Sequence, residues 1–187
     1  MQNLAIKIFN YNPQWENQFL ELKSLYLKAL GDKILKVEHV GSTSISGLKS
    51  KPVIDIDIVI KNSDILEKEV IKELEKLKYE HLGNMGISGR EAFKLLESEI
   101  YKYPKHNLYV CREGSIGIKN HILFRDYLRE NSTKVKEYGD IKECLAREFP
   151  NDIDDYCKGK TEFISEILLA SGMKQDDVEL IRDENQN

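Results

Sequence analysis

Residues 37–60 read VEHVGSTSISGLKSKPVIDIDIVI, and this stretch decides the fold because it joins two apolar strands through a turn of small residues. Side chains alternate across a strand, so Asp55 and Asp57 project from one face while the isoleucines of 53–60 cover the other. The stretch therefore predicts a sheet that packs on a core with one face and carries two carboxylates on the other.

Helices are expected before and after this stretch. Asn12 and Pro13 are typical of a helix start and Gly31 of a helix end, and apolar residues recur at helical spacing between them. A second helix is expected from Asp64 to about residue 78, since Asp64 and Glu67 form a capping-box pattern.

The rest of the chain alternates between turn-like and periodic segments. Residues 81–90 are predicted as a loop, 107–112 as a strand and 113–117 as a turn. The periodicity of 91–97 is ambiguous, and we favour a strand there. From His121 the pattern is helical, with a break at Asn131–Ser132. The polar residues 176–187 predict a frayed or disordered tail.

The length and composition are those of one ordinary globular domain. The chain has 187 residues, of which 41% are hydrophobic and 32% charged. We expect a single domain over 1–175, with sheet and helices mixed in 1–118 and helices alone in 119–175. The net charge of −4 argues against nucleic-acid binding driven by bulk charge.

The three cysteines, Cys111, Cys144 and Cys157, include no C-x-x-C pair, so we expect reduced thiols in a cytoplasmic protein. The N-terminal residues lack the pattern of a signal peptide. No apolar run approaches the ~20 residues that span a bilayer, so no membrane partner is expected.

The aspartate pair suits a metal-bound triphosphate. Two like charges roughly 7 Å apart on a strand repel each other, and a divalent cation removes that conflict. Mg²⁺ takes one or two carboxylates together with phosphate oxygens and water. The alternative is a solvated strand face, although Val53 and Val59 share the face of Asp55 and Asp57, and Asp is a poor strand former.

The segment GSTSISGLKS (41–50) is not a P-loop. That motif needs four residues between its glycines and a Lys directly after the second, whereas here five residues intervene and Leu48 follows Gly47. Lys49 or Lys51 can still reach a phosphate, and a solvated loop lysine is the alternative.

A Gly-Ser turn, a spacer and Asp-x-Asp on a strand resemble the signature of the nucleotidyltransferase superfamily with the DNA polymerase β-type fold. More specifically, the chain resembles the GrpB family of that superfamily. The segments that carry this resemblance run through nearly the whole chain: YNPQW (11–15), EHVGSTSISGLKSKPVIDI (38–56), GISGREAF (86–93), HNLYVC (106–111), HILFRDYLRE (121–130) and YCKGKTEFI (156–164).

The resemblance implies an α/β (α+β) fold with a small mixed β-sheet backed by helices and followed by C-terminal helices. It implies that Gly41, Ser42 and Thr43 bind a nucleotide and that Asp55 and Asp57 hold magnesium as catalytic ligands. The implied reaction transfers a nucleotidyl group from a Mg²⁺-bound nucleoside triphosphate to a hydroxyl acceptor, which the sequence leaves open as a small molecule, a protein or an RNA.

Active members of the superfamily place a third carboxylate on a later strand, and this chain departs from that pattern. The candidate strand offers His106 and Asn107 near its start, and Glu113 lies only beyond its end. His106 is the candidate base or ligand; the alternative is a strand histidine bonded to backbone. A nucleotide-binding or regulatory module without transfer, or an interaction protein, are therefore the rival functions.

Further cations are candidates for phosphate contacts. Arg90 follows a glycine-rich loop and is a candidate nucleotide ligand together with Lys51; a surface arginine is its alternative. Lys142, Tyr156 and Lys160 either line a substrate groove or lie on solvated helix faces. Arg125 and Asp126 are expected to fix a helix against the sheet.

Overall fold

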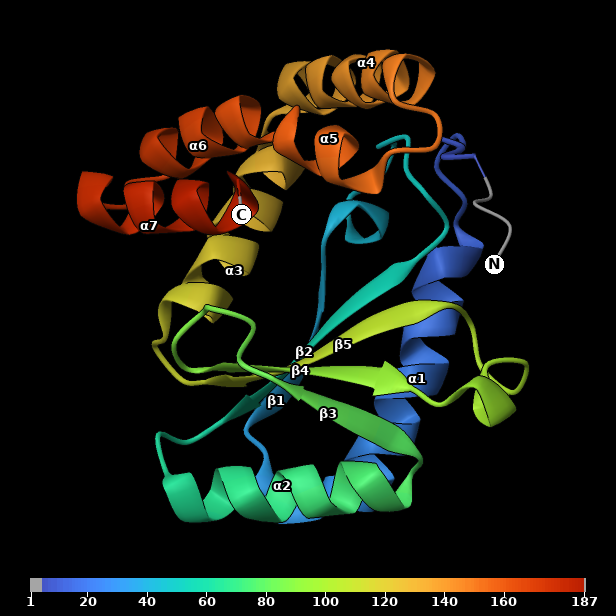
Figure 1. Ribbon diagram of the computed structural model, residues 1–187, viewed down its shortest axis with the longest axis vertical. Helices are drawn as coiled ribbons and strands as arrows, with labels where there is room; N and C mark the ends of the chain where they lie inside the picture. The colour runs from blue at the N-terminus through green and yellow to red at the C-terminus, as the bar shows by residue number, and fades with distance from the viewer. Residues whose placement is uncertain (1–4, 187) are drawn as a thin grey trace.

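The computed structural model describes residues 5–186 and contains a five-stranded mixed sheet with helices on both faces (Figure 1). The strand order is β1-β2-β5-β4-β3, in which β2 and β5 are parallel and the other neighbours antiparallel. The fold class implied by the resemblance, a small mixed sheet backed by helices, is confirmed.

The elements follow one another along the chain in this order: α1 (Gln14–Leu30), η1 (Gly31–Lys33), β1 (Lys36–Val40), η2 (Ser42–Ser44), β2 (Ile54–Ile60), α2 (Asp64–Lys76), β3 (Tyr79–Gly83), β4 (Arg90–Leu95), η3 (Glu97–Glu99), β5 (His106–Arg112), α3 (Ile116–Glu130), α4 (Ser132–Glu148), α5 (Ile153–Lys158), α6 (Thr161–Ala170) and α7 (Gln175–Gln186).

The main core lies between the sheet and helices α1 and α2. The apolar face of β2 supplies Ile54, Ile56, Ile58 and Ile60, all at most 1% exposed. Leu108 of β5 packs in the same layer, as do the buried residues of α1. Because these side chains alternate with Asp55 and Asp57, burying the isoleucines turns both carboxylates toward the opposite face.

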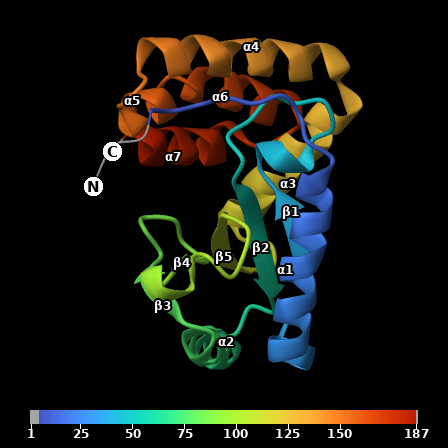
Figure 2. The ribbon, with the colours of Figure 1, turned by 90° about the vertical axis from the view of Figure 1, so that its right-hand side faces the viewer.

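Helix α3 covers that opposite face, and α4–α7 gather at one end of the sheet, whereas α2 lies at the other end (Figures 1 and 2). A second core joins α3, α4, α6 and α7. Ile45 and Leu48, which belong to the small-residue turn, are buried in this second core. The turn is therefore fixed between the sheet and the C-terminal helices.

The prediction of a disordered tail at 176–187 is wrong for the part that is described. Residues 175–186 form α7, and Val178 and Ile181 are 3% and 4% exposed in the second core. The two apolar residues are three apart and so share one helix face, which buries enough surface to hold an otherwise polar segment. Asn187 lies outside the described residues.

Two other boundaries differ from the sequence prediction. The segment predicted as a loop at 81–90 begins within strand β3, which extends to Gly83 and pairs with β4. Helix α3 begins at Ile116, five residues before His121 and inside the predicted turn. Local sequence does not show these boundaries because cross-strand pairing and packing on the sheet decide them.

The core position of α7 gives a first prediction. Ile181→Ala should lower the free energy of unfolding by about 2–4 kcal/mol, because it leaves a cavity in the second core. Leu180→Ala, one residue away and 56% exposed in the wild type, should change it by no more than about 0.5 kcal/mol. Urea unfolding of both variants measures the difference, and equal values would show that α7 does not pack as described.

Candidate active site

Asp57 is the most buried member of the carboxylate pair. It is 0% exposed, and its Oδ2 lies 2.8 Å from Nδ1 of His121 on α3. Its other oxygen, Oδ1, is buried and has no hydrogen-bond partner. A buried carboxylate oxygen without a partner is costly, so this atom marks a place where a cation or a donor would be stabilised.

Asp55 lies beside it, at the floor of a pocket. Its Oδ1 accepts a 2.7 Å hydrogen bond from Asn107 Nδ2, because the parallel register of β2 and β5 places these two residues side by side. Burial raises the pKa of the Asp55 carboxyl, and the bond from Asn107 opposes that shift.

The remaining positions of β5 on this face hold no acid. Asn107 is paired with Asp55 and Tyr109 with Asp57. Across residues 5–186, no cluster of three His, Cys, Asp or Glu side chains is arranged to hold a metal ion. The two carboxylates and the partnerless Oδ1 fit a Mg²⁺ ion that takes its other ligands from phosphate and water.

The turn after β1 brings backbone against this pair. Gly41 has φ +66°, and a Cβ atom there would overlap the carboxylate of Asp55. Ser42 follows it, with Oγ accepting a 3.0 Å hydrogen bond from Lys142 Nζ on α4. Position 41 thus requires glycine for two reasons: its backbone has positive φ, and it lies too close to Asp55 for a side chain.

Thr43 is placed differently from the prediction that it binds a nucleotide. It is 1% exposed, and its hydroxyl donates to the backbone oxygen of Val53 at 3.2 Å while meeting His39 Nε2 at 3.1 Å. Burial lowers the pKa of His39 to about 4. Thr43 therefore ties the turn to the start of β2 instead of facing the pocket.

The pocket above Asp55 has a volume of about 570 Å³ and is strongly cationic. Asp55 is the one carboxylate among its described lining residues, whereas the cations on its walls are Lys51, Arg90, Lys105, Lys142 and Lys160. Within the described chain, none of these cations forms an ion pair with a carboxylate. Such an excess of unpaired positive charge favours an anionic ligand.

Lys142 is the most buried of these cations, at 2% exposed. Its ammonium lies 4.6 Å from the centre of the Tyr138 ring. Burial lowers the pKa of Lys142 well below its ordinary value, and the charge of Lys160 adds to this. Lys142 therefore lines the pocket as a buried side chain, and the solvated helix face that its sequence context favours does not describe it.

Lys51 and Lys160 share one aromatic ring. Their ammonium groups lie 5.0 and 4.7 Å from the centre of the Tyr156 ring, which is 1% exposed. Burial lowers the pKa of Lys51, and the neighbouring charge of Lys160 acts in the same direction. The ring holds two like charges close together, which an anion between them would relieve.

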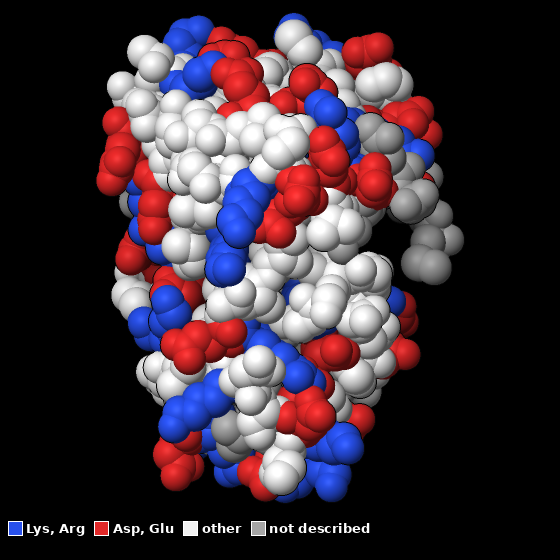
Figure 3. Space-filling view, turned by 90° about the vertical axis from the view of Figure 1, so that its left-hand side faces the viewer, with Lys and Arg blue, Asp and Glu red and all other residues white. Residues whose placement is uncertain are grey.

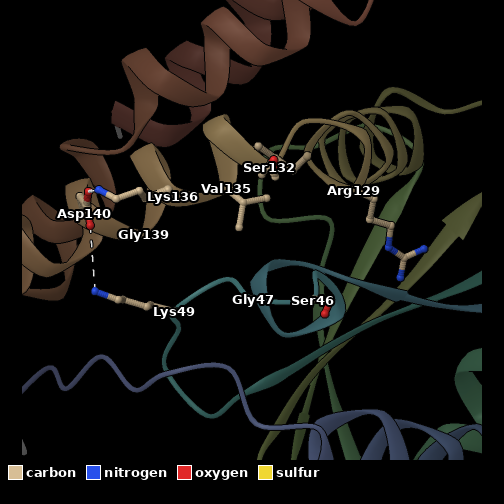
Figure 4. A pocket seen from close by; sticks show the side chains of 10 residues that line it. Ser46, Gly47, Lys49, Arg129, Ser132, Val135, Lys136, Gly139 and Asp140 are labelled. Carbon is tan, nitrogen blue, oxygen red and sulfur yellow. Dashed lines mark hydrogen bonds and ion pairs between the residues drawn. The ribbon is translucent and has the colours of Figure 1, made fainter.

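A second hollow, of about 420 Å³, lies on the other side of the turn, between residues 46–49 and α4 (Figure 4). Its cations are neutralised: Lys49 pairs with Glu143 at 2.9 Å, and Lys136 with Asp140 at 2.6 Å. Arg129 donates to the backbone oxygen of Ser44 at 2.8 Å and so supports the turn. The pocket above Asp55 differs from this hollow because, among the described residues, none of its cations has a carboxylate partner.

His106 lies on the wrong face of the sheet for catalysis. It pairs with Ile54, and its Nδ1 donates to the backbone oxygen of Pro104 at 2.6 Å. Its Nε2 accepts from the hydroxyl of Tyr79 at 2.6 Å, on the α1–α2 side. The catalytic role predicted for His106 is therefore wrong, and the backbone-bonded alternative describes it. The sequence could have shown this, because His106 alternates in step with Leu108 and Val110 and therefore shares their core-facing side of the strand.

His121 was missed by sequence reasoning, although it contacts Asp57 directly. It is the sixth residue of α3 and shares the surroundings of Tyr109, with ring centres 5.8 Å apart. A single histidine on an amphipathic helix gives no signal of this contact. Arg125, by contrast, does what was expected: it bonds Glu38 Oε2 at 2.8 Å and the backbone oxygen of His39 at 3.1 Å.

Charge elsewhere on the surface is mixed. On the face shown in Figure 3, basic and acidic side chains are interspersed, and the chain has a net charge of −4. In the described part of the chain, no helix combines the length and apolar character needed to cross a bilayer.

Comparison with known sequences shows one family over most of the chain. The family model described as GrpB protein matches residues 5–169. Glutamate-rich protein GrpB of Alkalihalophilus pseudofirmus is 32% identical over 161 residues, which cover 86% of this chain and 92% of that protein.

Comparison with solved structures gives the same family. The conserved protein GrpB from Enterococcus faecalis superposes with a TM-score of 0.77 and 32% identity, over 88% of this chain and 96% of that one. Cid1 in complex with its short product ApU gives a TM-score of 0.52 at 12% identity, over 75% and 43% of the two chains. At that identity the likeness concerns the fold alone, which is nucleotidyltransferase-like.

The close approach at Gly41 gives a second prediction. Gly47→Ala is the matched control, since Gly47 also has positive φ, +78°, but open space around its Cβ position. Gly47→Ala should cost about 1–2 kcal/mol of backbone strain. Gly41→Ala should cost at least about 2 kcal/mol more, because it displaces Asp55 as well. Similar losses for both variants in urea unfolding would contradict the contact.

Buried Lys142 gives a third prediction. Lys142→Met keeps most of the stem and removes the unpaired charge, so it should raise the free energy of unfolding by about 1 kcal/mol or more. Lys136→Met, at an exposed paired lysine, should stay within about 0.5 kcal/mol.

The same lysine sets a pH dependence. The folded protein binds fewer protons at Lys142 than the unfolded chain does, so its stability rises with pH between the lowered pKa and the ordinary 10.5. Lys142→Met should remove that rise. A variant less stable than the wild type at neutral pH would contradict the assignment of an uncompensated charge.

Proposed function

Because the chain belongs to the GrpB family and has a nucleotidyltransferase-like fold, we propose that it binds a nucleoside triphosphate with Mg²⁺ and transfers the nucleotidyl group to a hydroxyl acceptor. The observation that carries this proposal is the pocket: in the described part of the chain, lysines without a carboxylate partner line it together with Asp55, and the buried Asp57, two residues along β2, has an oxygen without a hydrogen-bond partner. A polyphosphate with a divalent cation complements both charges at once.

The lysines on the α4–α6 side suit the phosphates. Ser42 Oγ and Lys142 Nζ, 3.0 Å apart, form a donor pair beside the turn, and Lys160 lies on the same side of the pocket. Phosphate oxygens that accept from Lys142 would replace the solvation that burial removes from it. A bound phosphate also keeps this lysine protonated, which its surroundings alone disfavour.

Asp55 and Asp57 would hold the magnesium ion. Among the described residues, this site has two carboxylates and no third one beside them. We therefore propose that the nucleotide supplies the remaining ligands of the magnesium ion. When bound, Mg²⁺ would neutralise charge on the phosphate oxygens. In the transfer, the acceptor oxygen forms a bond to the α-phosphorus, the bond to pyrophosphate breaks, and the acceptor proton passes to water.

One observation favours a second candidate, a nucleotide-binding module without transfer. Asn107 and Tyr109 occupy the β5 positions beside the aspartates, so neither offers a carboxylate base. Such a module would bind the same Mg²⁺–nucleotide and release no pyrophosphate.

Calorimetry tests the binding that both candidates share. ATP, GTP, CTP and UTP are titrated with and without Mg²⁺, and at least one should bind more tightly with the ion. By reciprocal linkage, Mg²⁺ should bind less tightly without the nucleotide than with it. Asp57→Asn should abolish the effect of Mg²⁺, and Lys142→Met should weaken nucleotide binding at least about tenfold, since it removes a charge-assisted contact. Lys136→Met is the control and should bind as the wild type does.

Failure of all four nucleotides to bind would rule out both candidates. Where binding is found, release of pyrophosphate with a pool of metabolites or RNA separates the two. Release that depends on the pool and is lost in Asp57→Asn supports transfer. Tight binding without release supports the binding module.

A further inference from the structure

Arg90 lines the same pocket as the lysines but belongs to strand β4. It begins β4, and its guanidinium lies 4.8 Å from the centre of the Tyr109 ring on β5. Within residues 5–186 it forms no ion pair, and its Nε is buried without a hydrogen-bond partner. An arginine held on an aromatic ring with a donor unused is prepared to bind an oxyanion.

The fold fixes the stem of this side chain. A Cβ atom on Gly117 of α3 would lie 3.2 Å from Arg90 Cβ and 3.4 Å from its Cδ. The stem is thus confined between the start of α3 and the ring of Tyr109. Because the side chain is already confined, binding an anion here loses little conformational entropy.

The sheet order places Arg90 on the far side of the aspartates from the phosphate turn. Ser42 follows β1, the aspartates lie on β2, Tyr109 on β5 and Arg90 on β4. Strands are spaced about 4.8 Å apart, so Ser42 and Arg90 flank the acid pair from opposite sides. In phosphoryl-group chemistry, the attacking and leaving oxygens lie roughly in line through phosphorus.

We infer that Arg90, stacked on Tyr109, binds an anionic group, phosphate or carboxylate, of the acceptor, and that the nucleotide's own phosphates lie on the side of Ser42 and Lys142. The inference rests on the proposed function and narrows its acceptor to compounds that carry a hydroxyl and an oxyanion. It reassigns Arg90, for which sequence reasoning predicts a contact to the nucleotide.

The test observes the Nε–H signal of Arg90 by nitrogen-15 NMR in the whole chain. Mg²⁺ and a non-hydrolysable ATP analogue are present, and inorganic phosphate or acetate is added. A saturable shift of the Arg90 signal is expected with at least one anion, while the signals of Arg125 and Arg129 stay in place. Arg90→Lys identifies the signal by its loss.

Affinities separate the two sides of the pocket. Arg90→Lys should weaken the anion at least about tenfold, because it loses the bidentate fork, and change nucleotide affinity less than about twofold. Lys142→Met should weaken nucleotide binding at least about tenfold and change the affinity for the anion less than about twofold. Gly117→Ala should weaken binding of the anion although Arg90 itself is unchanged. Lys94→Met, at an exposed lysine of β4, should weaken binding of neither the anion nor the nucleotide. Urea unfolding confirms that each variant is folded.

Three results would overturn the inference. If neither anion shifts the Arg90 signal, Arg90 does not bind an oxyanion, and the proposal of nucleotide binding is unaffected. A tenfold loss of nucleotide affinity in Arg90→Lys assigns Arg90 to the nucleotide instead. Failure of the wild type to bind any nucleotide removes the proposed function and this inference together.

Discussion

The structure depends on one strand that must be apolar on one side and anionic on the other. The isoleucines of β2 lie in the main core, so Asp55 and Asp57 are carried into the interior on the opposite face. Burial of two carboxylates so close together is costly unless other groups compensate for it. Asn107 and His121 do so in part, and Asp57 Oδ1 is left without a partner.

The cations of the pocket are likewise held where burial, or the absence of a carboxylate partner among the described residues, leaves their charge uncompensated. Lys142 is almost fully buried with a hydroxyl as its partner, and Lys51 and Lys160 are held against one ring. Burial of the Lys142 charge is unfavourable in the free protein, and the unpaired positive charge of the pocket favours a ligand with several negative charges. The second hollow shows the usual arrangement, in which lysines are paired with carboxylates.

Much of the fold could be predicted because its signals are local. The helix ending at Gly31, strand 53–60 and the break at Asn131–Ser132 follow from capping, alternation and periodicity. The errors concern segments whose state depends on distant partners. Strand β3 exists because β4 pairs with it, and α7 is held beside α6 by Val178 and Ile181, which are buried in the second core.

The sequence by itself determined that two carboxylates follow a Gly-Ser turn on one face of a buried strand, because side-chain alternation is a property of the strand alone. Only the tertiary structure decided which groups face them. Lys142 is a hundred residues from Ser42 in the chain, and helical periodicity does not say where a helix docks. His121 and Arg90 reach the pocket, whereas His106 points into the core, because strand register and helix packing set those positions.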